Sequence, residues 1–316
     1  MISWNICGVD IAPGEKKQVI LEPNVPGYEM PATIICGSEP GKTIIITAGI
    51  HRGEYPGVAA VIRIAAEIDP AQVSGRILLV HYVNTSEFWE TSADKDDWNL
   101  NANFPGNPEG DIGDKIADYF VREVYPQADF IIDLHSGGQM EPLTTCLFFP
   151  ENAGVREVSM EAARATDIPY LIASAADKGL YSYGASKGIP ALLLERGHSG
   201  ACREEWIQEY ERDICLLLDY FEMYAYERKG HVCEKTIYNR SIYLTAEEKG
   251  LWYPTVTEGM KIECGQLLGC IKDYFGNLLR EYHAKADGTV FYYTSALAIK
   301  PQTPLVAYGL DEYVQK

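Results

Sequence analysis

Runs of β-branched and apolar residues that alternate with helical patterns constrain the fold of this chain most. Thr43 to Ile50 (TIIITAGI) is almost entirely apolar, which predicts a strand buried on both faces of a sheet. Similar strands are predicted at Ile77 to Val83, Phe130 to Leu134 and Ala191 to Leu194. Between and after them lie the expected helices, from Tyr55 onward and over 112–124, 155–166 and 206–228. This alternation predicts an α/β fold with a mixed, mostly parallel sheet flanked by helices.

The texture of the sequence changes after about residue 230. Short strand-like pieces, separated by Gly, Pro and Asp turns, occur at Lys235–Leu244, Leu251–Tyr253, Leu267–Ile271, Gly288–Tyr293 and Pro304–Tyr308. They predict a small all-β domain, a sandwich or a barrel. A chain of 316 residues suits one large domain with a smaller one. We therefore expect two domains, 1–230 and 231–316.

Charge and composition limit the kinds of molecule that the protein is expected to bind. The formal net charge is -18, so the surface repels nucleic-acid phosphates and anionic membranes. No apolar run is long enough to span a bilayer, and Met1 to Asn5 does not resemble a signal peptide. The 8 cysteines contain no C-x-x-C pair and are expected to be free thiols. We expect a cytoplasmic protein. Formation of a homo-oligomer is left as an alternative, because proteins of this size and class often dimerise.

Three potential metal ligands follow predicted strands. His51 and Glu54 come directly after the first strand, and His135 follows the third. In an open α/β sheet, ligands bind beyond the carboxyl ends of the strands. An H-x-x-E pair alone is weak evidence for a metal site, because such pairs often occur by chance on solvated turns. Two histidines and one glutamate, however, match the ligands of a catalytic zinc, whose fourth position is left for water. The expected cofactor is one Zn²⁺ per chain, with Asp133 as an acceptor for the His135 imidazole.

A fourth polar residue ends another apolar strand at the same edge. Glu195 follows Leu194, and a carboxylate beside a zinc site can take a proton from water and pass it to a leaving amine. The alternative is a structural ion pair with Arg196. The sequence has no H-E-x-x-H, no P-loop and no G-x-S-x-G, so a thermolysin-type protease, a P-loop NTPase and a serine hydrolase are not indicated.

Four segments, in this order, resemble the succinylglutamate desuccinylase and aspartoacylase branch of the zinc carboxypeptidase superfamily. They are H-R-G-E-Y-P-G at 51–57, N-L-N-A-N-F-P-G at 99–106, D-L-H-S-G-G at 133–138, and the strand-end Glu195. The resemblance covers nearly the whole chain. It implies zinc-dependent hydrolysis of an amide, namely deacylation of a small N-acyl amino acid or amine.

The same resemblance implies roles for individual residues. His51, Glu54 and His135 would hold the zinc, and Glu195 would be the catalytic base. Asn101 matches the substrate-contacting Asn of the family, and Asn103 is a second candidate for a substrate contact. The small β domain would cover the cleft and restrict it to small substrates.

The sequence departs from the family where the substrate carboxylate is bound. The family's Arg at this point is Ala102 here, and a second Arg expected shortly upstream is absent. Arg binds carboxylates bidentately, so carboxylate recognition is expected to be altered. The positive charge would come from Arg52, Lys95, Arg196 or Arg203, or else the substrate lacks the usual carboxylate.

Two other functions stay open. A carboxypeptidase acting on a peptide or a cell-wall fragment would use the same zinc, but it must hold a terminal carboxylate, and Ala102 counts against it. A non-catalytic zinc-containing binding protein would need no base, and Glu195 counts against that.

Overall fold

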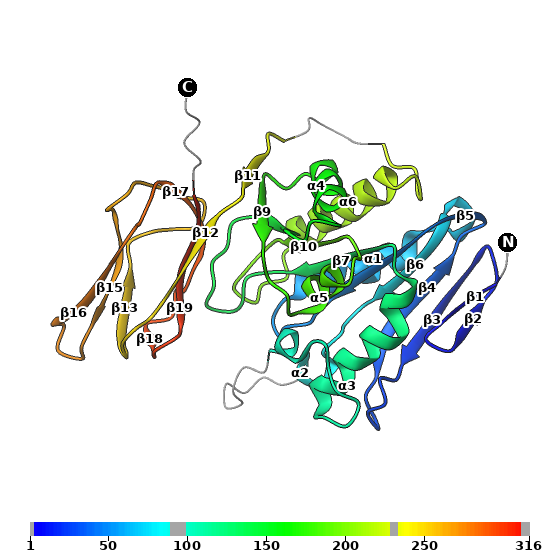
Figure 1. Ribbon diagram of the computed structural model, residues 1–316, viewed down its shortest axis with the longest axis horizontal. Coiled ribbons are helices and arrows are strands. Elements are labelled where there is room, and N and C mark those ends of the chain that lie inside the picture. Colours follow the sequence, from blue (N-terminus) through cyan, green and yellow to red (C-terminus); the bar gives the residue numbers. More distant parts are fainter. Residues whose placement is uncertain (1–2, 89–98, 228–232, 311–316) are drawn as a thin grey trace.

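The computed structural model describes residues 3–88, 99–227 and 233–310. Within these ranges the chain forms one large sheet flanked by helices, and two smaller sheets built from the C-terminal residues (Figure 1). A short antiparallel pair, β1 (Trp4–Ile6) with β2 (Val9–Ile11), precedes the large sheet.

Nine described strands make the large sheet, and its mixed pairing confirms the predicted fold class. In order across the sheet they are β11 (Thr236–Tyr238), β9 (Tyr170–Ser174), β8 (Cys146–Pro150), β10 (Ala191–Glu195), β7 (Phe130–His135), β5 (Glu39–Ala48), β6 (Ser74–Val80), β4 (Met30–Cys36) and β3 (Glu15–Leu21). Strands β10, β7, β5 and β6 run parallel to one another at the centre. Their carboxyl ends therefore meet at one edge.

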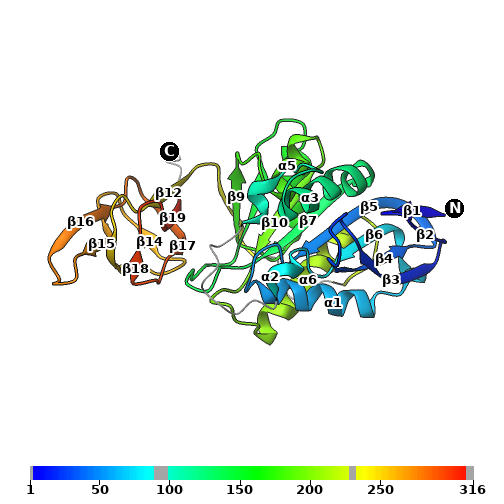
Figure 2. The ribbon, with the colours of Figure 1, turned by 90° about the horizontal axis from the view of Figure 1, so that it is seen from below.

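Both faces of this sheet are covered, as the apolar strands require. Ile44 and Ile46 of β5 pack into one core with α1 and α6, whereas Ile45 packs on the opposite face with α3 and α5. Figure 2 shows α3 and α5 on one side of the sheet and α1 and α6 on the other. The helices are α1 (Tyr55–Glu67), α2 (Thr85–Phe88), α3 (Ile112–Tyr119), α4 (Arg156–Ala165), α5 (Leu180–Ser186) and α6 (Glu204–Tyr220), with short turns η1 (Pro70–Gln72), η2 (Leu100–Asn103), η3 (Phe120–Val124) and η4 (Tyr125–Gln127).

Two predicted helices end earlier in the structure. The helix expected over 112–124 is α-helical only to Tyr119 and continues as a π-helical turn, η3. The helix expected over 206–228 ends at Tyr220. Glu222 has a left-handed φ of 57°, and an α-helix cannot continue through a residue in that conformation. Residue 228 lies outside the described residues.

The C-terminal residues form two four-stranded antiparallel sheets, as the sequence predicts. One contains β12 (Ser241–Thr245), β19 (Pro304–Leu310), β17 (Gly288–Tyr293) and β14 (Lys261–Ile262), and the other β16 (Leu278–His283), β15 (Leu267–Lys272), β13 (Gly250–Pro254) and β18 (Ala298–Ile299). Trp252, Leu268 and Val290 are among the buried residues of the core between these sheets. We call this part, residues 241–310, the C-terminal β unit.

The piece predicted at Lys235–Leu244 is two strands that belong to different sheets. β11 pairs in parallel with β9 of the large sheet, and only β12 joins the C-terminal β unit. Tyr238 of β11 packs with Phe291 of β17, so the two parts share a small apolar cluster. The domain division at residue 230 stays a prediction.

No described helix is long and apolar enough to cross a membrane. All 8 cysteines are unpaired.

Candidate metal centre

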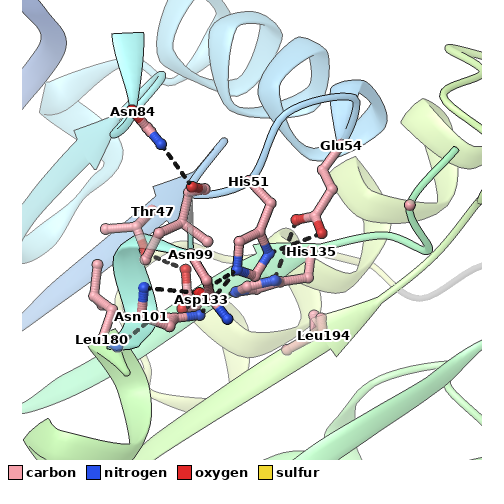
Figure 3. Close-up of polar contacts among 12 residues, drawn as sticks. Thr47, His51, Glu54, Asn84, Asn99, Asn101, Asp133, His135, Leu180 and Leu194 are labelled. Atoms are coloured by element: carbon pink, nitrogen blue, oxygen red, sulfur yellow. Dashed lines mark hydrogen bonds and ion pairs between the residues drawn. The ribbon is translucent and has the colours of Figure 1, made fainter. Parts of the chain in front are cut away.

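The carboxyl edge of the large sheet brings the three predicted ligands together. His51 lies in the turn after β5, Glu54 directly precedes α1, and His135 is the last residue of β7 (Figure 3). One potential ligand atom from each residue lies within 4.8 Å of the others, and no other group of His, Cys, Asp or Glu in the described chain does this. Gly57, in the first turn of α1, lies against Leu134 of β7. A Cβ added at Gly57 would lie 2.8 Å from the Cβ of Leu134, so the first turn of α1 packs closely on β7.

The carboxylate of Glu54 joins the two imidazoles. Its Oε1 lies 3.0 Å from Nδ1 of His51, and its Oε2 lies 3.1 Å from Nδ1 of His135. The oxygen Oε2 is buried, and it meets the His135 imidazole without a hydrogen bond of good geometry. Ligands bound tetrahedrally at 2.0–2.2 Å from zinc are roughly 3.4 Å apart. The donor atoms, their spacing and the poorly bonded oxygen of Glu54 therefore fit a metal ion.

Each imidazole is held on its other side by an oxygen acceptor. Nε2 of His51 lies 3.0 Å from Oδ1 of Asn99, and Nε2 of His135 lies 3.1 Å from Oδ2 of Asp133. Thr47 in turn donates a hydrogen bond of 2.7 Å to Oδ1 of Asp133. Such acceptors fix the ring and leave Nδ1 to face a metal. The predicted partner of His135 is thus in place, and Asn99 is a residue that sequence reasoning missed.

Burial and close charges shift the pKa values of these groups. Burial alone would raise the pKa of Glu54, but the imidazoles of His51 and His135 outweigh it and bring the pKa to about 2. For His135 burial acts to lower the pKa, and the carboxylates of Glu54 and Asp133 raise it well above its usual range. The Glu54 carboxylate is thus ionised and paired with both imidazoles.

Glu195 ends the neighbouring strand and lies opposite His135 in the register of β10 and β7. Its Oε2 is buried without a hydrogen bond. Burial raises the pKa of Glu195 well above its usual range, with His135 opposing and Glu54 adding to the rise. Arg196 is not its partner, because that guanidinium bonds Asp213 of α6 at 2.6 Å.

Tyr210 of α6 ties the ends of β7 and β10 together. Its hydroxyl donates to the backbone oxygen of His135 and accepts a hydrogen bond of 2.8 Å from the backbone N of Arg196. The two strand ends that carry His135 and Glu195 are therefore held in one arrangement.

The two predicted substrate contacts lie in different surroundings. Nδ2 of Asn101 is 3.5 Å from Nε2 of His51, and its Oδ1 accepts a hydrogen bond of 2.9 Å from the backbone N of Leu180. Asn103 is not brought to the ligand cluster, because its Nδ2 bonds Oδ1 of Asp114 at 3.1 Å, at the start of α3. Both substrate roles stay predictions.

The residues considered as replacements for the family's carboxylate-binding Arg also lie in different surroundings. Arg196 is buried against α6, and Arg203 is exposed, with its guanidinium over the Trp206 ring. Arg52 is half-buried beside His51 in the chain. Lys95 lies outside the described residues.

The chain is similar to proteins of known family. Residues 40–221 match the family model of the succinylglutamate desuccinylase/aspartoacylase catalytic domain. An N-alpha-acetyl-L-2,4-diaminobutyric acid deacetylase of Halomonas elongata is 29% identical over 274 residues, which cover 83% of this chain and 80% of that protein.

Solved structures share the fold. The product-bound ectoine utilization protein EutE (DoeB) of Ruegeria pomeroyi aligns over 90% of both chains, with a TM-score of 0.80 and 24% identity. A succinylglutamate desuccinylase of Silicibacter sp. TM1040 covers 90% of this chain and 89% of that one, with a TM-score of 0.78 and 25% identity. Because the family model spans more than half of the chain, and the predicted branch is the one matched, the chain belongs to the succinylglutamate desuccinylase/aspartoacylase family.

Proposed function

We propose that this protein is a zinc-dependent deacylase that hydrolyses the amide of a small N-acyl amino acid or amine. The observation that carries the proposal is the convergence of His51, Glu54 and His135 within 4.8 Å, with Glu195 on the adjacent strand end. His51, Glu54 and His135 would hold the ion. Zinc bound there would polarise the acyl oxygen and make a water molecule acidic enough to react near neutral pH.

The remaining chemistry belongs to residues of the chain. Glu195 is proposed to accept a proton at its buried oxygen Oε2, which has no hydrogen bond in the structure, and later to deliver that proton to the leaving nitrogen. Asp133 and Asn99 orient the two imidazoles from outside the ligand set. The apolar core beneath the strand ends keeps these groups fixed before a substrate arrives.

The relatives support a deacylase. The Halomonas elongata protein is named for removing an acetyl group from a diamino acid, and the family is named for two N-acyl amino acid hydrolases. A carboxypeptidase finds less support, because Ala102 stands where the family carries an Arg and because Arg196 is occupied by Asp213.

The test is hydrolysis of a panel of N-acetyl, N-succinyl and N-formyl amino acids and amines, with short peptides included. The zinc-loaded protein should cleave one acyl class, and Glu195→Gln should lower kcat by about 10²–10⁴-fold, as expected on removing a general base. Glu205→Gln, an exposed carboxylate in the first turn of α6, is the matched control and should leave the rate unchanged.

Metal dependence is tested in the same assay. A chelator should abolish turnover, and added Zn²⁺ should restore it. Zinc binding without turnover on the whole panel would reject the deacylase and favour the non-catalytic binding protein. Cleavage of peptides alone would favour the carboxypeptidase.

A further inference from the structure

A fully buried amide outside the ligand set lies beside the turn that carries His51. Asn84 follows the end of β6, and Figure 3 shows its side chain pointing toward that turn. Its Nδ2 donates a hydrogen bond of 3.3 Å to the backbone oxygen of Ile50. This oxygen belongs to the peptide group that joins Ile50 to His51. The amide therefore contacts the backbone directly before the first proposed ligand.

Backbone pairing between the two strand ends stops one residue before this peptide group. The backbone N of Val83 donates to Ala48 at 2.9 Å, and the backbone N of Asn84 donates to Gly49 at 3.0 Å. Gly49 has a left-handed φ of 70°, so the chain turns out of the sheet at this point. The next carbonyl, that of Ile50, is bonded by the side chain of Asn84. The side chain thus supplies a bond that the backbone pairing does not reach.

The orientation of the Asn84 amide follows from two of its partners. The Ile50 oxygen can only accept a hydrogen bond, so the Nδ2 group faces it. The hydroxyl of Ser86 donates a hydrogen bond of 2.8 Å to Oδ1 of Asn84. Burying an amide is costly unless it is hydrogen-bonded, and an apolar side chain would fill the same space without that cost. The amide is therefore explained by the backbone group that it holds.

The direction of the His51 side chain depends on this peptide group. Rotation of the peptide plane changes ψ of Ile50 and φ of His51, and with them the direction of the imidazole. His135 needs no such support, because it ends a central strand and is itself paired in the register of β7 and β10. His51 lies beyond its strand, and the acceptor of its Nε2, Asn99, is exposed. Contacts within the turn therefore decide where His51 points.

We propose that Asn84 is a positioning residue of the metal centre, which fixes the peptide group before His51 and so aims the His51 imidazole at the ion. The inference rests on the proposed function, because it concerns the proposed zinc ligands. Asn84 acts through His51 and contacts neither the ion nor the substrate. Without its donor the turn is free to rearrange, and ordering it on metal binding costs part of the binding free energy.

The test removes the Nδ2 donor and keeps the size of the side chain. Asn84→Leu should weaken Zn²⁺ binding by about tenfold or more, the lower end of the range for groups that orient a metal ligand. The measurement is a competition titration of Zn²⁺ against a chelator of known affinity. Asn84→Ser is the second variant, to be used if the leucine variant does not fold. Its hydroxyl is one bond shorter than the amide and loses the contact with Ile50, so the same loss of affinity is expected.

Ser159→Ala is the matched control. Ser159 is fully buried, and its hydroxyl accepts a hydrogen bond of 3.0 Å from the backbone N of Ala191, at the start of β10 and thus at the opposite edge of the sheet. The variant loses a buried bond of the same kind, so its stability in urea should fall while its zinc affinity stays within about twofold. Lower stability with unchanged zinc affinity in the Asn84 variants would mean a purely structural role and overturns the inference.

Hydrogen exchange of the metal-free protein separates this inference from the proposed function. At urea concentrations that give equal global stability, the backbone amides of residues 50–54 should exchange at least about tenfold faster in Asn84→Leu than in Ser159→Ala, because the turn is released locally. If wild type binds no zinc, the proposed function fails, and this comparison alone decides whether Asn84 holds the turn. Equal exchange in the two variants overturns the inference, with or without zinc binding.

Discussion

The two imidazoles of the metal centre are held by chemically different acceptors. His135 is backed by the carboxylate of Asp133, which is fully buried and fixed by Thr47. His51 is backed by the amide of Asn99, which is exposed. A carboxylate makes the ligand more basic and orients it more strongly than an amide does. At the scale of single residues, His135 is therefore the better-prepared ligand of the pair.

Asp133→Asn should weaken zinc binding by about 10- to 100-fold, because it keeps the shape of the acceptor and removes its charge. The measurement is a competition titration of Zn²⁺ against a chelator of known affinity, with the thermal midpoint recorded to confirm folding. Asp177→Asn, at an exposed position, is the control. Unchanged affinity in Asp133→Asn would show that this carboxylate does not support the ligand.

At the scale of elements, helix α6 organises the ends of the strands. Its Tyr210 hydroxyl bonds the backbone of His135 and of Arg196, and its Asp213 neutralises the Arg196 guanidinium in the core. The helix thereby satisfies polar groups that the ends of β7 and β10 would otherwise bury. The same contacts pair Arg196 with Asp213, and the Glu195 carboxylate forms no ion pair with a Lys or an Arg in the described chain.

Tyr210→Phe should lower the free energy of unfolding by about 1–3 kcal/mol, because it leaves buried backbone groups of β7 and β10 without their partner. Urea denaturation provides the measurement. Tyr220→Phe, in the last turn of the same helix where the side chain is 42% exposed, should change the stability by less than about 0.5 kcal/mol. A Tyr210→Phe protein as stable as wild type would mean that the hydroxyl does not hold the strand ends.

At the scale of the whole molecule, two regions with separate apolar cores meet through a small shared cluster. Cys146, Ile172 and Tyr238 of the large sheet pack against Phe291 of the C-terminal β unit. The Tyr238 hydroxyl also lies 2.5 Å from that of Thr289. Thr144, in the loop that follows His135, donates a backbone hydrogen bond of 2.8 Å to Phe291, so the β unit also holds this loop.

Phe291→Ala should lower the free energy of unfolding by about 3–5 kcal/mol, the usual cost of truncating a buried Phe. Because it empties the shared cluster, it should also separate the melting of the β unit from that of the large sheet. Differential scanning calorimetry would record two transitions where the wild type shows one. Tyr253→Ala, at an exposed position of the same unit, should keep the wild-type profile, and a single transition in Phe291→Ala would reject the coupling.

Residues close together in the chain carried most of what could be predicted. Apolar runs of strand length gave the central parallel strands, because burial on both faces leaves little freedom in composition. His51, Glu54 and His135 could be placed together since they follow strands whose carboxyl ends share an edge. Strands β3, β4, β8 and β9 were not predicted. β4, β8 and β9 are short apolar runs, which a sequence does not distinguish from buried helical segments, and β3 contains several polar residues.

Other features depend on contacts between distant segments, and only the tertiary structure decided them. Asn99 reaches His51 across the sheet edge, β11 leaves the C-terminal piece to pair with β9, and the loop after β7 is held by backbone hydrogen bonds to β17. A sequence pattern records which face of an element is apolar, but it does not record which partner covers that face. The sequence by itself thus determined the fold class, the central parallel strands and the candidate ligands and base. The folded chain decided what surrounds them, because hydrogen bonds between remote segments leave no local periodicity in the sequence.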